Sequence, residues 1–312
     1  MKIVFLDAKT IGEDLDLSPF DKLGEVIKYP FSSAKDVPER VRDADVVILN
    51  KVQINEQTIH TAGQLKLVCV TATGTNNLDK KYLEERGIAW RNVAGYSTQS
   101  VAQHTFAMLF YLLEKLPYYD QYVKSRRYVN DTFFTHFEQV FHQLNSMTWG
   151  IIGLGSIGRR VADIARMFGA RVIYCSPSGT PPQPGYDQVS FHDLLASSDI
   201  ISVHAPLNKF TENLLDEQAF RQMRPHTIFL NLGRGQIVAE DALAAALKHH
   251  WIAAAGLDVL AVEPMSEDSP LLDLIDNPNL FITPHIGWAS IEARNQLISI
   301  IAGQISDFFS QI

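Results

Sequence analysis

The sequence predicts an α/β protein with two doubly wound domains, each built on a parallel β-sheet. The chain has 312 residues, which is too long for a single ordinary hydrophobic core. Short, continuously apolar runs alternate with longer amphipathic stretches, and this rhythm occurs as two separate series. Continuous apolar strands joined by helices are typical of parallel sheets that are covered on both faces.

The first series occupies the N-terminal part of the chain. Its apolar runs predict strands over residues 2–7, 45–50 and 65–74, and the amphipathic stretch 32–45 predicts a helix between the first two. The series ends near residues 92–95. A long apolar helix is predicted next, over Thr98–Leu116, followed by a polar stretch that is rich in aromatic residues.

The second series begins with the sequence "WGIIGLG". We expect strands over residues 149–155, 171–176, 200–206, 227–233, 252–259 and 280–287. No strand follows the final amphipathic helix, Ser290–Phe309. This helix could therefore complete the second domain or pack on the first, and its periodicity does not decide between them.

Composition excludes several classes of protein. Apolar residues make up 46% and charged residues 20%, as in a folded globular chain, and the net charge of −8 argues against binding nucleic acid or an anionic membrane. Cys69 and Cys175 lie in apolar runs, which indicates buried, reduced thiols rather than a disulfide or a metal site. The apolar run at the N-terminus is too short for a signal peptide, so we expect a cytoplasmic protein. The two cysteines have no metal-binding spacing, so we expect no metal.

Three glycines, Gly153, Gly155 and Gly158, stand between a predicted strand and a predicted helix. In a dinucleotide-binding loop they would permit the tight turn, the approach of the pyrophosphate to the backbone, and close helix–strand packing. The helix N-terminus would then offer the N–H groups of Ser156 and Ile157 to the phosphates. Such glycines also occur in unrelated βα turns, but the strand, loop, helix and second strand together favour a dinucleotide.

Ser176 ends the strand that follows this helix. An acidic residue there would accept hydrogen bonds from the ribose hydroxyls and repel a 2′-phosphate, whereas a neighbouring arginine would attract one. The segment 175–185 contains no charged residue. The local sequence therefore leaves both NAD(H) and NADP(H) open.

Four ionisable residues follow predicted strands, where ligands bind in this class of fold: Arg234, Asp258, Glu263 and His285. Each alone has an ordinary structural explanation, such as a solvated arginine or a buried histidine. Together they suggest a catalytic site, because a guanidinium can hold a carboxylate bidentately and a histidine beside a glutamate can act as a general acid. With a dinucleotide, this set suits hydride transfer to or from a 2-oxo or 2-hydroxy acid.

The chain resembles the D-isomer-specific 2-hydroxyacid dehydrogenase family, in particular its glycerate dehydrogenases, also called hydroxypyruvate reductases. The matching segments lie in family order, at residues 72–79, 95–110, 150–162, 231–243, 256–264 and 283–290. The resemblance implies a Rossmann-type coenzyme domain, residues 99–286, inserted into a flavodoxin-like substrate domain formed by residues 1–98 and 287–312. It also implies that an aromatic arm, residues 117–147, contributes to a homodimer interface.

The resemblance further implies roles for the strand-end residues. Arg234 would bind the substrate carboxylate and polarise the keto oxygen, and His285 would exchange a proton with that oxygen. Glu263 would hydrogen-bond His285 and favour its protonated form. Asp258 would contact the nicotinamide end of the cofactor, and Leu232 would lie among the cofactor contacts.

The resemblance also implies that residues of the first series bind substrate. Thr73 and Gly74 would offer backbone N–H groups to the carboxylate, with the Thr73 side chain near the cofactor. Lys51, which follows a predicted strand, could meet a second polar group of the substrate, although a solvated loop lysine is the commoner explanation.

Two questions stay open at this stage. Ser176 replaces the acid usual in the family, and Pro177 stands where NADP-using relatives often carry arginine, so NAD(H) is only slightly favoured over NADP(H). The expected substrate is hydroxypyruvate or glyoxylate. Alternatives are lactate, phosphoglycerate or a branched 2-oxo acid, or a non-catalytic corepressor that senses a dinucleotide.

Overall fold

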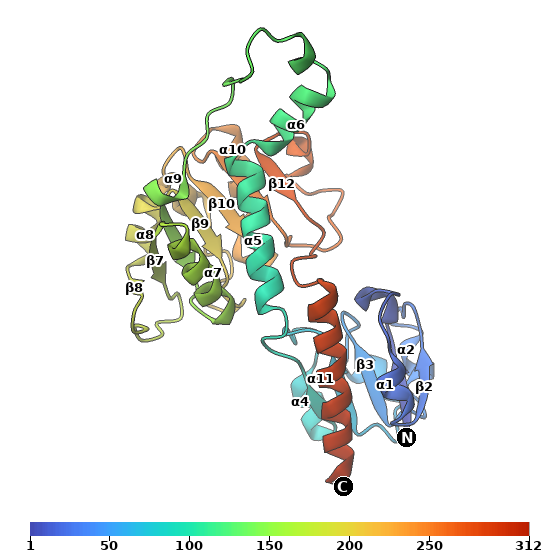
Figure 1. Cartoon of the computed structure of the whole chain (residues 1–312). Coiled ribbons are helices and arrows are strands. Elements are labelled where there is room, and N and C mark those ends of the chain that lie inside the picture. The colour runs from blue at the N-terminus through green and yellow to red at the C-terminus, as the bar shows by residue number, and fades with distance from the viewer. Residues whose placement is uncertain (312) are drawn as a thin grey trace. The chain divides into compact units, whose positions relative to one another are not determined.

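The computed structural model describes residues 1–311, which form two compact units (Figure 1). Unit 1 comprises Met1–Ser97 and Trp288–Ile312, and unit 2 comprises Thr98–Gly287. The domain boundaries expected from the family resemblance differ from these by one residue at each crossing.

Unit 1 contains a sheet of five parallel strands in the order β2-β1-β3-β4-β5, which is the flavodoxin-like order. The strands are β1 (Lys2–Phe5), β2 (Glu25–Lys28), β3 (Val46–Leu49), β4 (Leu67–Val70) and β5 (Ala89–Arg91). Sequence periodicity predicts the three central strands but misses β2 and β5. Both are edge strands with exposed polar residues, so they lack the continuous apolar signal of the buried strands.

Helices cover both faces of this sheet. They are α1 (Ser18–Asp21), α2 (Val37–Arg40), α3 (Glu56–Ile59), α4 (Lys80–Glu85), α11 (Ile291–Ser310) and the 3-10 turn η1 (Ala8–Ile11). Val4 and Val47 pack with α2, α3 and α4, whereas Ile3 and Ile48 pack with α1 and α11 on the opposite face. The last helix of the chain therefore completes unit 1 (Figure 1).

The helix predicted over residues 32–45 is much shorter in the structure, where only Val37–Arg40 is helical. Upstream, Asp36 accepts hydrogen bonds from the backbone N–H and the hydroxyl of Ser33 and so forms a turn before the helix. Pro38 then stands in the first turn of the helix, where its missing N–H costs nothing. The side-chain turn therefore replaces the first part of the predicted helix.

Unit 2 contains a sheet of seven parallel strands in the order β12-β11-β10-β9-β6-β7-β8. They are β6 (Thr148–Ile152), β7 (Arg171–Cys175), β8 (Asp187–Gln188), β9 (Ile200–Val203), β10 (Ile228–Asn231), β11 (Ala254–Leu257) and β12 (Leu280–Ile282). This is the Rossmann order, extended by one strand. The order reverses between β6 and β9, which are paired side by side, so the ligand-binding switch point lies there.

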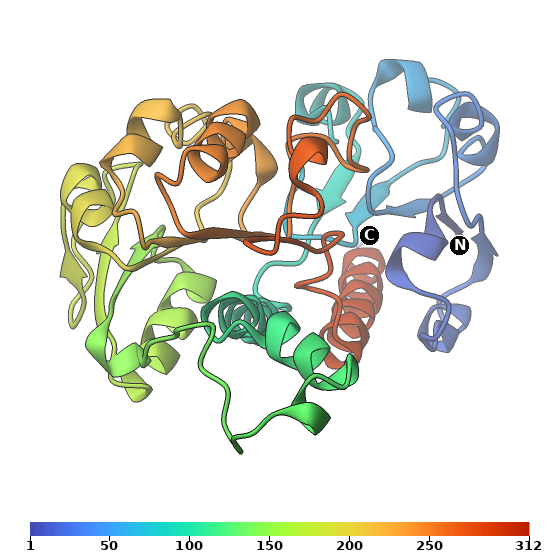
Figure 2. The ribbon, with the colours of Figure 1, turned by 90° about the horizontal axis from the view of Figure 1, so that it is seen from above.

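The sheet of unit 2 lies between two layers of helices (Figure 2). The helices and 3-10 turns of this unit are α5 (Thr98–Leu113), α6 (Leu116–Lys124), η2 (Tyr128–Asn130), η3 (Leu144–Ser146), α7 (Ser156–Met167), α8 (Phe191–Ser197), α9 (Glu217–Gln222), η4 (Gly235–Ile237), α10 (Glu240–Lys248) and η5 (Leu272–Leu274). The long helix predicted to reach Leu116 ends at Leu113, because Lys115 takes a left-handed conformation before α6 begins. Among residues 1–311, no helix combines the length and the apolar character needed to cross a membrane.

Candidate functional site

The glycine loop joins β6 to α7 at the switch point of unit 2. Gly153 has a φ of +92°, and a Cβ on it would lie 2.7 Å from the Cα of Ala205. A Cβ on Gly158 would lie 2.2 Å from the carbonyl oxygen of Gly153, whereas one on Gly155 would meet nothing within 4 Å. Gly153 and Gly158 are thus required by the fold itself, and Gly155 leaves open the space that a pyrophosphate would need.

The N-terminus of α7 faces this open space. The helix begins at Ser156, and the N–H of Arg159 donates to the carbonyl of Gly155 at 2.9 Å. The preceding N–H groups, including those of Ser156 and Ile157, belong to the first turn and have no intrahelical acceptor. This arrangement fits the phosphates of a dinucleotide.

His204 is a residue of this site that sequence reasoning missed. It follows β9, and its backbone N–H donates at 2.8 Å to the carbonyl of Ile152, the residue directly before the glycine loop. Its Nε2 lies 3.1 Å from the Ser202 hydroxyl, but its buried Nδ1 finds no partner within residues 1–311. Burial lowers the pKa of His204 to about 3, so the ring is neutral. A buried polar atom without a partner beside a glycine loop is consistent with a ligand at this place.

Ser176 directly follows β7, which ends at Cys175, one residue before the predicted strand end, so the serine lies at the carboxyl edge of the sheet. Its hydroxyl oxygen accepts the backbone N–H of Thr180 at 3.1 Å, and its carbonyl accepts the N–H of Gly179 at 3.0 Å. The serine therefore closes a turn in its own loop. Its hydroxyl proton stays available for an outside acceptor such as a ribose or phosphate oxygen.

Arg234 follows β10 in a turn that the Asn231 side chain holds. The amide of Asn231 accepts the N–H of Gly233 and donates to the Arg234 carbonyl, both at 3.0 Å. A Cβ on Gly235 would lie 1.8 Å from the carbonyl carbon of Leu260, so only glycine fits there. This close approach brings the loop of Arg234 against the loop that carries Glu263.

His285 and Glu263 are hydrogen-bonded, with 2.7 Å between Nδ1 and Oε2. Both side chains are about one quarter exposed, at 25% and 29%. The other carboxylate oxygen of Glu263 accepts the N–H of Leu260 at 3.1 Å, which fixes its orientation. Since Nδ1 is occupied by the carboxylate, Nε2 of His285 is the nitrogen available to a substrate.

Asp258 is buried and holds the loop of His285. Its carboxylate accepts the N–H groups of Ile286 and Gly287, at 2.8 and 2.9 Å, and the Thr283 hydroxyl at 2.7 Å. Nε2 of His104, on α5, lies 3.5 Å from the same carboxylate. Burial by itself would raise the pKa of Asp258, but these hydrogen bonds outweigh it and hold the pKa below the usual 3.8. The contact with nicotinamide expected for Asp258 stays a prediction.

The remaining predicted residues lie at the carboxyl ends of the strands in unit 1. Lys51 follows β3, and its backbone N–H donates to Asp7 at 2.7 Å. Thr73 follows β4; its hydroxyl donates to the Val93 carbonyl at 2.9 Å, and its own carbonyl accepts from Asn92. Gly74 comes next in the same loop. These residues thus occupy the end of the sheet at which flavodoxin-like folds bind ligands.

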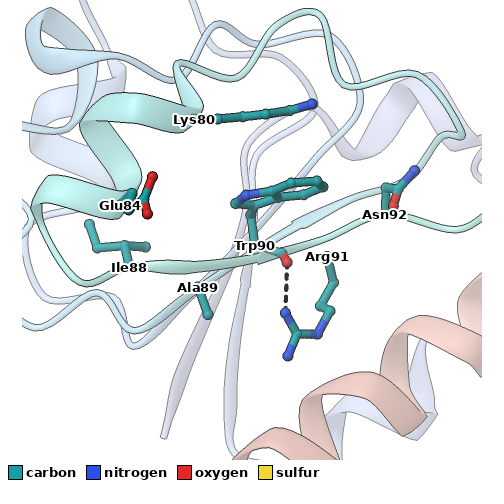
Figure 3. A pocket seen from close by; sticks show the side chains of 7 residues that line it. All are labelled: Lys80, Glu84, Ile88, Ala89, Trp90, Arg91 and Asn92. Carbon is teal, nitrogen blue, oxygen red and sulfur yellow. Dashed lines mark hydrogen bonds between the residues drawn. The ribbon is translucent and has the colours of Figure 1, made fainter.

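A hollow of about 700 Å³ lies on unit 1 along the edge strand β5 (Figure 3). It is lined by Lys80, Glu84, Ile88, Ala89, Trp90, Arg91 and Asn92. Arg91 donates to the Trp90 carbonyl at 2.9 Å, and the Lys80 ammonium lies 4.7 Å from the centroid of the Trp90 ring. Charged side chains beside an exposed edge strand are a common protection against pairing with another chain, and Lys80 and Arg91 fit that role here.

The fold and the site of unit 2 define a class of protein. A glycine loop at a Rossmann switch point suits a dinucleotide, and the imidazole–carboxylate pair beside an arginine loop suits proton exchange on a bound carboxylic acid. These are the parts of a dinucleotide-dependent oxidoreductase.

Comparison with known proteins gives the family. The family profile described as "D-isomer specific 2-hydroxyacid dehydrogenase, NAD binding domain" matches residues 106–287. A hydroxypyruvate reductase of Blautia hydrogenotrophica is 34% identical, over 99% of this chain and 97% of its own length. A glycerate dehydrogenase of Methylorubrum extorquens is 33% identical, over 98% and 94%. The chain therefore belongs to the D-isomer-specific 2-hydroxyacid dehydrogenase family, an NAD(P)-dependent class of enzymes.

A solved structure agrees with this assignment. An acyclic imino acid reductase in complex with NADPH and D-arginine superposes with a TM-score of 0.88. Its sequence is 28% identical, and the match covers 100% of this chain and 98% of the other. The Rossmann-type fold and the family predicted from the sequence are thus confirmed, while the substrate is left open.

The bonds of Asp258 predict a pH-dependent effect on stability. Because the folded-state pKa is lowered, ionised Asp258 stabilises the protein above its usual pKa of 3.8, and this contribution is lost as the pH falls through the folded-state value. Asp258→Asn should therefore be less stable than the parent at pH 7, by a margin that shrinks below about pH 4. Urea unfolding at several pH values measures the margin. Exposed Asp276→Asn is the control, and a margin independent of pH would contradict the assignment.

Proposed function

We propose that this enzyme reduces hydroxypyruvate or glyoxylate to the corresponding D-2-hydroxy acid or to glycolate. The observation that carries the proposal is the 2.7 Å hydrogen bond between His285 and Glu263, and the loop of Glu263 adjoins the loop of Arg234. Relatives named hydroxypyruvate reductase and glycerate dehydrogenase, each matched over nearly their full length, support a three-carbon substrate, and a relative named glyoxylate reductase supports a two-carbon one.

Arg234 is proposed to bind the substrate. Its planar guanidinium can hold a carboxylate bidentately and can polarise the adjacent keto oxygen. The side chain is half-buried, and one of its nitrogens donates to the Gly233 carbonyl at 2.7 Å, which limits its rotation. The orientation of the guanidinium is thus restricted before substrate arrives.

His285 is proposed to supply the proton. The cofactor, when bound, supplies the hydride that adds to the keto carbon. Nε2 of protonated His285 then gives its proton to the developing alkoxide oxygen, which completes the hydroxyl group. Glu263 accepts from Nδ1 throughout and so holds the orientation of the ring. In the oxidative direction His285 takes the proton back.

Residues of unit 1 are proposed to complete substrate binding. The backbone N–H groups of Thr73 and Gly74 would donate to the substrate carboxylate, and Lys51 would bind a polar group at the distal end. Thr73 would also contact the cofactor, together with Leu232, which follows β10 in unit 2. The observation that supports this role is that these segments of unit 1 follow β3 and β4 at the carboxyl edge of its sheet.

NAD(H) is the proposed cofactor, favoured slightly over NADP(H). Ser176 can bond to a ribose hydroxyl through its free proton, and the 175–185 segment offers no positive charge to a 2′-phosphate. We also propose a cytoplasmic location, with which the buried thiols of Cys69 and Cys175 agree; burial raises the pKa of each to about 12.

A homodimer built on the aromatic arm is the proposed assembly. The arm is internally ordered, since the Tyr122 ring stacks on His136 with 3.9 Å between ring centroids. Yet Phe134 and Phe137 are 87% and 81% exposed, among several other apolar side chains of the arm. Apolar groups presented by an ordered segment indicate a binding surface, and we assign it to a second copy of this chain.

Replacing the proton donor tests the function. His285→Ala should lower kcat with hydroxypyruvate at least about 100-fold, because general acid–base catalysis contributes about 10²–10⁴-fold. NADH binding, followed by fluorescence titration, should stay within about twofold of the parent, because the dinucleotide loop is untouched. His250→Ala is the matched control, since His250 is exposed and has the same left-handed φ of 55°. A parent protein that binds NADH but turns over no 2-oxo acid would favour the corepressor alternative.

Cofactor choice is tested at Ser176. A carboxylate at this position would face a 2′-phosphate, so Ser176→Asp should lower kcat/KM with NADPH at least about tenfold relative to that with NADH. Ser178→Asp adds the same charge to the same loop, two residues further on. Equal effects of the two substitutions would show that selection does not act through position 176.

The arm is tested by removing its exposed rings. The double variant Phe134→Ser and Phe137→Ser should sediment as a monomer at concentrations where the parent is a dimer, because the apolar area buried between copies would be lost. Phe210→Ser, at an exposed phenylalanine outside the arm, should leave the dimer intact. A monomeric parent would rule out the proposed assembly.

A further inference from the structure

Asp7 lies at the switch point of unit 1. It follows β1, whose neighbours in the sheet are β2 and β3, so the strand order reverses between β1 and β3. In flavodoxin-like folds this is the crevice that receives a ligand. Here the protein places one of its own carboxylates in it, and Asp7 is only 4% exposed.

The carboxylate of Asp7 binds the loop that follows β3. It accepts the backbone N–H groups of Asn50 at 2.8 Å, Lys51 at 2.7 Å and Val52 at 3.3 Å. Successive N–H groups that converge in this way form a concave anion-binding nest. In this molecule an internal anion fills the nest, so the loop backbone is fixed without any external ligand.

Asn77 holds the same loop from its carbonyl side. Its side-chain amide donates to the carbonyl oxygens of Asn50 and Val52, at 3.2 and 2.9 Å. Its own backbone carbonyl accepts the N–H of Ile54 at 2.8 Å. Since Asn77 belongs to the loop that contains Thr73 and Gly74, the two proposed substrate-binding loops are joined directly.

We propose that Asp7 and Asn77 are positioning residues for substrate binding, which fix the backbone of residues 50–52 and thereby the place of Lys51 relative to Thr73 and Gly74. This inference rests on the proposed function, because it takes these loops to be the substrate loops. Asp7 has no contact with the reacting atoms in this proposal. It acts through the loop that it binds.

The stability of the protein gains nothing from this charge at neutral pH. Burial raises the pKa of Asp7, although the N–H groups of residues 50–52 and the nearby Lys51 charge act in the opposite direction. A raised folded-state pKa contributes stability at low pH that is lost as the pH rises, so ionised Asp7 is a cost near pH 7. Asp7→Asn should therefore gain stability relative to the parent as the pH rises, which separates a positioning role from a purely structural one.

The experiment compares steady-state kinetics of Asp7→Asn and Asn77→Ser with those of the parent, using hydroxypyruvate and NADH. Each variant should raise the KM for hydroxypyruvate at least about fivefold while kcat changes less than about threefold, as expected when ground-state and transition-state binding are lost together. The dissociation constant of NADH should not change. Asn77→Ser acts on the opposite side of the loop and keeps the test decisive should Asp7→Asn fold poorly.

Asp45→Asn is the matched control. Asp45 accepts the N–H of Lys2 at 2.7 Å and so ties the amino ends of β1 and β3, the same two strands that Asp7 ties at their carboxyl ends. This control should leave the KM for hydroxypyruvate unchanged. An active parent together with an unchanged KM in both variants, or with an equal rise in Asp45→Asn, would overturn the inference alone. A parent that reduces no 2-oxo acid would overturn the proposed function and the inference with it.

Discussion

Parallel pairing of the strands is the constraint on which the site depends. In unit 2 all seven strands run in one direction, so the segments after β6, β9, β10, β11 and β12 emerge at one edge of the sheet. These segments carry the glycine loop, His204, Arg234, Glu263 and His285. Residues that are far apart in the sequence therefore lie at the same edge of the sheet because of strand direction.

Buried carboxylates fix the backbone of the loops that follow the strands. Loops expose backbone N–H groups that no strand partner satisfies, and each needs an acceptor when it is buried. Asp258 accepts the N–H groups of the consecutive residues Ile286 and Gly287, and Asp7 accepts from three consecutive residues after β3. The hydrogen bonds outweigh burial for Asp258 and do not for Asp7, as the opposite directions of their pKa shifts indicate. At neutral pH the ionised carboxylate that fixes the loop therefore stabilises the fold in the case of Asp258 and destabilises it in the case of Asp7.

The sequence predicts the central strands and the glycine loop because their signals are local. The apolar run of β9 and the spacing of Gly153, Gly155 and Gly158 are both visible in consecutive residues of the chain. The edge strands β2 and β5 are half exposed, so their apolar signal is weak, and the 32–45 segment follows a helical pattern that the Asp36–Ser33 turn overrides.

The site is predictable to the same extent. Arg234, Glu263 and His285 stand out in the sequence because they are ionisable residues that follow strands, and their roles stay a proposal. His204 and Asp7 also follow strands, but their importance depends on partners 40 or more positions away in the chain, or on the lack of a partner, which no local pattern contains. The same reason explains why the hold of Asp258 on its loop emerges only from the structure.

His285 takes a left-handed backbone conformation, with φ at 55°. A side chain with a Cβ adopts this region at a cost of about 1–3 kcal/mol, whereas glycine does so freely and asparagine with less strain. Folding alone would accordingly favour another residue at this position, and the proposed proton transfer is our explanation for the imidazole there. Under the proposed role, relatives that no longer catalyse the reaction would tolerate glycine or asparagine at position 285. The residue at this position would then distinguish catalytic from non-catalytic relatives.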